Sequence, residues 1–233
     1  MGLVPWTKLI ITTISGGIYS VFEIMKAGGL VMWLLLTCSI IMLAVIIERF
    51  WSLQTKYVAP KNLLSQVWQW EKLGYLDAKR IDDLRRGSPL GRILAAGLTR
   101  YGHDRDIIKE SIEDAGRMVA HDLERFLNVL ATLAGIAPLI GLFGTVIGII
   151  KVFAAVSVHG VGDPNFLAGG ISEALFTTAG GLAVAIPSLV SYRYFRGRVD
   201  TLIIVMEQEA FKLLVQLHEL QARRAHESGK TKA

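Results

Sequence analysis

The sequence predicts an all-α membrane protein with three transmembrane helices and long cytoplasmic helical extensions. Of its 233 residues, 52% are apolar and 19% are charged, whereas ordinary globular chains carry roughly 25% charged residues. A helix that crosses a bilayer needs about 20 apolar residues, and three stretches of that length contain one charged residue between them. Helical periodicity in the polar segments predicts further helices there.

The three apolar windows define the expected membrane spans. They cover residues 28–47, 127–150 and 166–191. The second window ends at Lys151, and the third contains Glu173 as its single charged residue. The preceding segment, residues 1–27, has an apolar run interrupted by Thr, Ser and Gly residues. We expect this segment to face outward and to form an amphipathic helix at the membrane surface.

Lys and Arg residues are distributed unevenly, and their distribution predicts the orientation of the chain. Two precede residue 28, 14 lie in residues 48–126, one is Lys151, and eight follow residue 191. Cytoplasmic segments carry the excess of basic residues. We therefore expect residues 48–126 and 192–233 to be cytoplasmic, and the N-terminus and the connection 151–165 to face outward. This placement accounts for the net charge of +5, so no nucleic-acid partner is expected.

The cytoplasmic segments carry signals for long helices. Ser88 followed by Pro89 predicts a helix start. Asp104 is expected to cap a helix that continues to about Val156 without a breaker. The third span similarly continues beyond a kink expected at Pro187. Its apolar stripe consists of Leu202, Met206, Leu213, Leu217 and Leu220. Such stripes need partners, either within one subunit or in the helical bundle of a homo-oligomer, which we expect.

Small residues form a narrow stripe along the second span. Gly141 and Gly148 belong to this stripe, and Gly144 lies on a neighbouring face. Small residues let two helix backbones approach closely inside a membrane, although the spacing does not say whether they do more than pack. Thr145 shares the stripe, and its hydroxyl must bond either to a carbonyl one turn back or to a group across an interface.

Glu173 is the first candidate for a functional residue. It lies about seven residues inside the third span, which is roughly 10 Å at 1.5 Å per residue. Ionisable residues at such depth are costly and often relay ions or protons. Two alternatives without a role in proton transfer remain: the side chain reaches the outer interface, or it forms a fixed ion pair with Lys151. Lys151 is therefore a possible modulator of Glu173.

Hydroxyl groups extend this candidate site. Thr145 is expected at a depth similar to that of Glu173, since the two spans run in opposite directions. Thr177 lies on nearly the same helix face as Glu173, whereas Thr178 lies about 140° away. Because one carboxylate cannot form a complete proton relay, water or an acidic residue of a partner is implied.

Other chemistry finds little support. The sequence has no GxxxxGK[ST] loop, its single cysteine cannot form an internal disulfide, and its histidines lack ligand spacing. We expect no metal, no cofactor and no enzymatic activity. Three arginines after the third span are interpreted as topology determinants that could also hold anionic lipid head groups. They are Arg193, Arg196 and Arg198.

Two segments carry a resemblance to a known family. LATLAGIAPLIGLFGTVIGI and GGISEALFTTAGGLAVAIPSLVSY resemble the second and third spans of the MotA/TolQ/ExbB proton-channel proteins, most closely those of ExbB. By position, the resemblance assigns the proton pathway to Glu173, Thr145 and Thr178, and the kink to Pro187. Lys151 departs from the family pattern, which has an uncharged residue or His there. Gly169-Gly170 departs too, replacing a Pro-Gly pair.

The resemblance also implies an assembly and a function. Family members form pentamers around a central pore that holds a single-span ExbD- or TolR-like partner. They sit in the bacterial inner membrane and use the proton-motive force to drive TonB or TolA. We expect an ExbB-like subunit that serves TonB-dependent outer-membrane transport. The alternatives are a TolQ-like subunit of the Tol-Pal system and a passive scaffold for a single-span partner.

Overall fold

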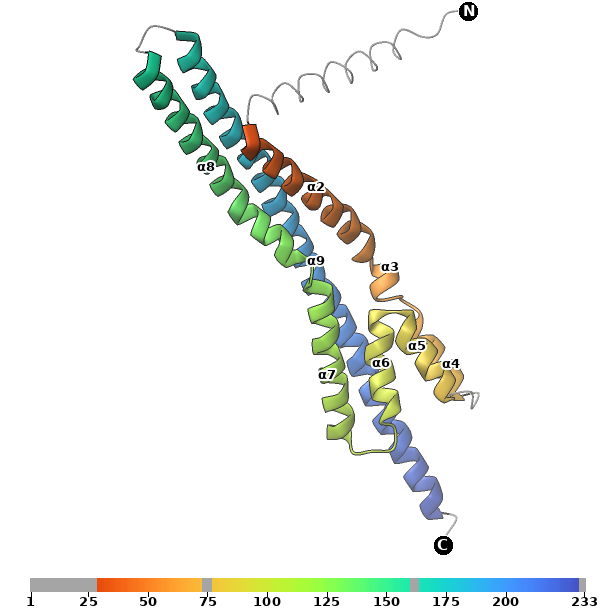
Figure 1. Ribbon diagram of the computed structural model, residues 1–233. Helices are drawn as coiled ribbons and strands as arrows, with labels where there is room; N and C mark the ends of the chain where they lie inside the picture. The colour runs from red at the N-terminus through yellow and green to blue at the C-terminus, as the bar shows by residue number, and fades with distance from the viewer. Residues whose placement is uncertain (1–28, 73–76, 160–163, 231–233) are drawn as a thin grey trace, which may run out of the picture. The chain divides into compact units, whose positions relative to one another are not determined.

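A computed structural model describes residues 29–72, 77–159 and 164–230, and every regular element among them is an α-helix (Figure 1). The helices in chain order are α2 (Gly29–Ser52), α3 (Thr55–Val58), α4 (Leu63–Lys72), α5 (Ala78–Gly87), α6 (Pro89–Thr99), α7 (Arg105–Glu124), α8 (Leu127–His159) and α9 (Pro164–Lys230). The amphipathic segment expected in residues 1–27 lies outside the described residues.

Three helical stretches are long and apolar enough to cross a membrane, and they include α2 and parts of α8 and α9. No more than a third of the residues in each apolar window are buried within the chain. Large apolar side chains therefore face outward, among them Leu139, Phe143 and Leu175. Such a surface requires lipid or another protein against it. The predicted all-α fold with three membrane-length helices is confirmed.

The chain divides into two compact units. The spanning unit consists of residues 1–46 and 129–192, and the polar unit consists of residues 47–128 and 193–233. Helix α9 contributes to both units and runs without interruption past Pro187. The kink expected at Pro187 stays a prediction.

The core of the polar unit forms where α6, α7 and the C-terminal part of α9 meet. Gly97 on α6 lies so close to its neighbours that a Cβ there would be 2.9 Å from Ile112 and 3.2 Å from Leu213. The apolar stripe predicted for α9 supplies four fully buried side chains, Leu202, Met206, Leu213 and Leu217. Helix α6 begins as predicted, because the Ser88 hydroxyl accepts a hydrogen bond from the Gly91 amide at 3.0 Å.

The prediction of one helix from Asp104 to about Val156 is wrong in one respect. Helix α7 starts after Asp104, whose side chain makes no capping bond, and ends at Glu124, so two residues separate it from α8. At this break Arg49 Nη1 donates to the Leu123 carbonyl oxygen at 3.0 Å, and the guanidinium lies 4.8 Å from the centre of the Phe126 ring. The Arg49 side chain of α2 thus binds a backbone acceptor at the end of α7.

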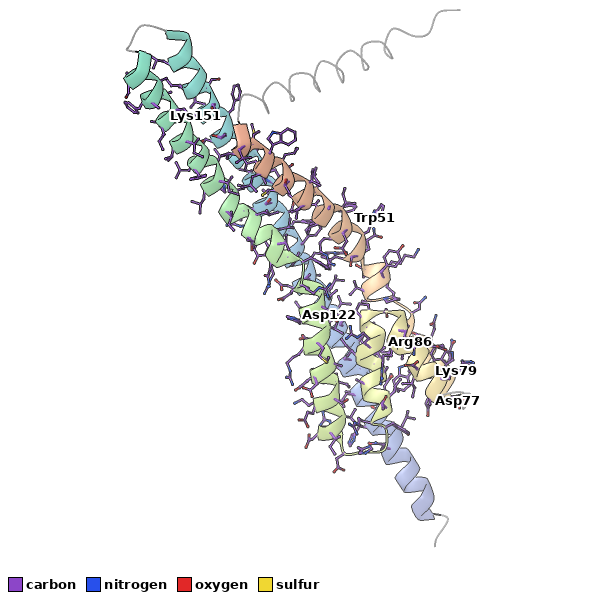
Figure 2. All side chains as sticks on the ribbon, viewed as in Figure 1. Trp51, Asp77, Lys79, Arg86, Asp122 and Lys151 are labelled. Atoms are coloured by element: carbon purple, nitrogen blue, oxygen red, sulfur yellow. The ribbon has the colours of Figure 1, made fainter. Side chains whose placement is uncertain are left out.

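We expect Arg49→Met to destabilise the polar unit. Arg49 is 4% exposed, and its loss would leave a buried carbonyl without its donor, which costs about 1–3 kcal/mol. Thermal unfolding in detergent should therefore have a lower midpoint. Arg86→Met is the matched control, since the Arg86 side chain is 80% exposed (Figure 2). Equal midpoints for the two variants would contradict a structural role of Arg49.

Candidate functional site

Close packing of α8 on α9 positions the candidate site in the spanning unit. A Cβ at Gly141 would lie 2.8 Å from the Thr177 carbonyl oxygen, and one at Gly148 would lie 2.9 Å from the Gly170 carbonyl oxygen. Gly144 faces the Thr177 side chain in the same way. The small residues predicted to permit close approach therefore pack two helices of one chain.

Glu173 and Lys151 form an ion pair between α9 and α8. Lys151 Nζ lies 2.6 Å from Glu173 Oε1, and Figure 2 labels Lys151 on α8. The Glu173 side chain is 17% exposed and the Lys151 side chain is 55% exposed. A charge-assisted bond at this distance is strong, and partial burial of the carboxylate reduces its screening by solvent.

Gly29 brings the start of α2 to the same carboxylate. Its φ is +61°, and a Cβ at this position would lie 2.6 Å from Glu173 Oε1. A little further along, α2 also packs on α9, because a Cβ at Gly180 would lie 3.2 Å from Met32 Sδ and 3.4 Å from Leu35 Cδ1. Three helices thus meet around Glu173: α9 carries it, α8 supplies the ammonium, and α2 supplies a backbone that fits only without a side chain.

The hydroxyl groups of the predicted pathway donate to backbone carbonyls. Thr145 donates to Leu142 at 2.5 Å, and Thr177 to Ala174 at 2.9 Å. Thr178 Oγ1 lies 3.4 Å from the Gly141 carbonyl oxygen, which links α9 to α8. Since each hydroxyl has one proton, none of the three donates to Glu173. Their oxygens can still accept bonds from water.

The helix face that carries Thr177 is a packing face within the chain. Thr177 is 1% exposed, and Ser188 on the same face is 0% exposed and donates to the Val184 carbonyl oxygen at 2.8 Å. Thr145 and Thr178 are half-buried. The structure therefore brings Lys151 to Glu173, while Thr177 contacts α8 instead of extending an open polar track from the carboxylate.

Two of the three arginines that follow the third span have protein partners. Arg196 pairs with Glu124 at 3.2 Å, and Arg198 donates to the Thr55 hydroxyl at 2.7 Å. Arg193 is exposed. Of the three, Arg193 is the residue best placed to meet a lipid head group.

Sequence reasoning missed Gly29 and Arg49. The Gly28-Gly29 pair at the start of the first span was the available signal, because glycines at an element boundary often mark an unusual φ or a close approach. In the sequence, Arg49 has the position of an ordinary charged residue at the end of a membrane span. Its burial depends on residues about 74 positions away in the sequence, which no local pattern reveals.

The geometry around Glu173 defines a class of protein. Among the described residues, three membrane-length helices surround one carboxylate, which forms an ion pair with a lysine. This describes a helical membrane protein with an ionisable group inside its spans, the usual mark of an ion or proton pathway.

Comparison with known proteins gives the family. Residues 85–208, more than half of the chain, match the model of the MotA/TolQ/ExbB proton channel family. The chain belongs to this family, whose members are proton-channel subunits and not enzymes.

Relatives of both branches are similar to the chain. A putative biopolymer transport protein ExbB homolog of Methanothermobacter thermautotrophicus is 31% identical over 78% of this chain and 64% of its own length. The chain thus spans less than two thirds of that relative. A putative ExbB-like protein 3 of Synechocystis is 30% identical over 88% of this chain and 97% of its own length. The Tol-Pal system protein TolQ of Haemophilus influenzae is 32% identical over 74% of this chain and 81% of its own length.

Proposed function

We propose that this chain is the proton-channel subunit of an inner-membrane energy-transducing complex of the ExbB type. It would couple the proton-motive force to TonB-dependent outer-membrane transport, with Glu173 as the group that takes up and releases the proton. The observation that carries the proposal is the placement of this single carboxylate among three membrane-length helices of a proton-channel family member. The names of the ExbB-type relatives support the branch.

Energy considerations suit this role. Each proton that crosses the membrane supplies about 2.3 kcal/mol per 100 mV. Protonation of Glu173 removes one charge from its ion pair with Lys151, and so changes the relative stability of two packing arrangements. The work is then passed to a TonB-like protein. Water bound to threonine hydroxyl oxygens would carry the proton to and from Glu173; these threonines are Thr145, Thr177 and Thr178. The packing of the helices would depend on Gly141, Gly144, Gly148 and Pro187.

The proposed assembly follows from what one chain lacks. The three predicted spans contain one acidic residue, so a second acidic group must come from a single-span ExbD- or TolR-like partner. Exposed apolar side chains on all three membrane helices suit a homo-oligomer, a pentamer by family resemblance, around that partner. The chain would lie in the bacterial inner membrane with its N-terminus outside and its C-terminus in the cytoplasm, and Arg193 would meet anionic lipid.

Two other functions have observations in their favour. The similarity to TolQ of Haemophilus influenzae favours a subunit of the Tol-Pal envelope-integrity system. The short Lys151–Glu173 ion pair favours a passive scaffold, in which the carboxylate never releases its lysine. Deletion of the gene distinguishes the ExbB-type function from the Tol-Pal function. Loss of TonB-dependent uptake is expected for the first, and loss of detergent resistance for the second.

Proton flux into liposomes tests the proposal itself. The chain is reconstituted with a single-span ExbD- or TolR-like protein of the same organism, and each protein is also reconstituted alone at equal density. An imposed potassium diffusion potential should acidify only the liposomes that contain both proteins. Absence of flux with a correctly assembled pair would contradict a proton channel and favour the scaffold.

A further inference from the structure

The start of α2 and the carboxylate of Glu173 fit each other closely. Gly29 has φ +61°, in a region that residues with a Cβ rarely adopt. A Cβ there would lie 2.6 Å from Glu173 Oε1, 3.6 Å from Glu173 Cδ and 3.7 Å from Lys151 Nζ. An added methyl group would therefore meet the end of a flexible side chain, and the carboxylate would have to move. Position 29 thus controls where the carboxylate lies.

Two positive charges converge on that position. The Lys151 ammonium lies 2.6 Å from Oε1. The amino end of a helix carries a partial positive charge from its aligned peptide dipoles, so α2 also favours an anion beside Gly29. The groups that face Glu173 from the two packed helices are thus the Lys151 side chain of α8 and the backbone of α2. Both place positive charge beside the carboxylate.

The lysine can leave without disturbing the helices. Its side chain is 55% exposed, and the close packing of α8 on α9 is made by Gly141, Gly144 and Gly148. When a proton binds Glu173, the carboxylate becomes a neutral carboxylic acid, the ion pair is lost, and Lys151 keeps its own proton and charge. A proton and an ammonium group therefore compete for one carboxylate.

We propose that Gly29 is a positioning residue that holds Glu173 where the Lys151 ammonium and an incoming proton exchange on it. Lys151 is then the cation that an incoming proton displaces from the carboxylate. This inference rests on the proposed function, because it concerns the same carboxylate. It gives a role to the lysine that departs from the family pattern and to a glycine outside the two segments that carry the resemblance.

Carbodiimide labelling tests the proposal without a proton current. Dicyclohexylcarbodiimide reacts with protonated carboxyl groups in apolar surroundings, and mass spectrometry of the peptide containing Glu173 measures the labelled fraction against pH. In Lys151→Gln the carboxyl group has no ammonium group beside it, so the fraction of Glu173 labelled at a given pH should rise severalfold. Lys151→Arg retains the charge and should label much as the wild type does.

Gly29→Ala should shift the labelling in the same direction by a smaller amount, since the methyl group displaces the carboxylate from Lys151. Gly169→Ala is the matched control: Gly169 lies four residues before Glu173 on α9, and a Cβ there has no neighbour within 4 Å. If Gly29→Ala does not fold, Gly29→Asn replaces it, because Asn tolerates a left-handed φ while still adding a Cβ.

The outcomes separate this proposal from the proposed function. An unchanged labelling profile in Lys151→Gln would overturn the competition, and an unchanged profile in a folded Gly29 variant would overturn the positioning role. Proton flux by the wild-type pair without any change of labelling in the variants would support the channel and reject the roles of Gly29 and Lys151. A change of labelling in the variants without flux would support the roles of Gly29 and Lys151 and reject the channel.

Discussion

Glu173→Gln is expected to reduce proton flux through the assembled complex to the level of empty liposomes. An amide has nearly the same shape as the carboxyl group but binds no proton at these pH values. No other acidic residue lies in the predicted spans to replace it. Glu173→Asp should retain part of the flux, because it keeps the titratable group and shortens its reach by one methylene. The flux assay described for the wild-type pair gives the measurement.

The control for this variant is Glu110→Gln, which removes the same charge from an exposed position on α7. It should conduct as the wild type does. Assembly is compared by co-purification of the partner, so that a loss of flux is not a loss of complex. Wild-type flux in Glu173→Gln would show that the proton takes a path without this carboxylate.

Gly141→Ala and Gly148→Ala are expected to have the largest effect on stability. In both cases the new methyl group meets a backbone carbonyl oxygen of α9 at less than 3.0 Å, which no side-chain rotation relieves. Overpacking of this kind costs typically 1–3 kcal/mol, so the double variant approaches the roughly 5–15 kcal/mol that holds a whole protein folded. We expect low yield of the double variant and a clear fall in its unfolding midpoint in detergent.

Gly135→Ala provides the matched control on the same helix, since a Cβ there has no neighbour within 4 Å. Its effect should be neutral or stabilising, because alanine favours helix by up to about 1 kcal/mol over glycine. A loss of stability in Gly141→Ala and Gly148→Ala, without a loss in Gly135→Ala, would show that close packing causes the effect. A general sensitivity of α8 to substitution would lower the stability of all three variants. A similar loss of stability in all three single variants would contradict the packing described here.

The architecture could be predicted from the sequence because each signal was local. Apolar windows of sufficient length with at most one charged residue located the three membrane helices, and Ser88-Pro89 located the start of α6. The break between α7 and α8 could not be predicted in this way. Arg125 keeps a helical backbone conformation, and the interaction that marks the break comes from Arg49 in a distant segment.

Part of the candidate site could be predicted from the sequence, but the packing around it could not. Glu173 stood out because ionisable residues inside membranes are rare, and Lys151 was named as its possible partner. Helical periodicity placed Thr177 on the Glu173 face correctly, yet it could not tell whether that face lines a pathway or packs on α8. The contact between Thr177 and Gly144 depends on the register of two helices, which the sequence of either helix does not contain.

The uninterrupted course of α9 has a mechanical consequence. Its 67 residues include Glu173 near one end and the buried Leu213 and Leu217 toward the other. Each turn of an α-helix is hydrogen-bonded to the next, so the spanning unit and the polar unit share one continuous backbone element. A proline introduced at position 193, where the two units join, would remove a hydrogen bond from that element at a cost of about 3 kcal/mol.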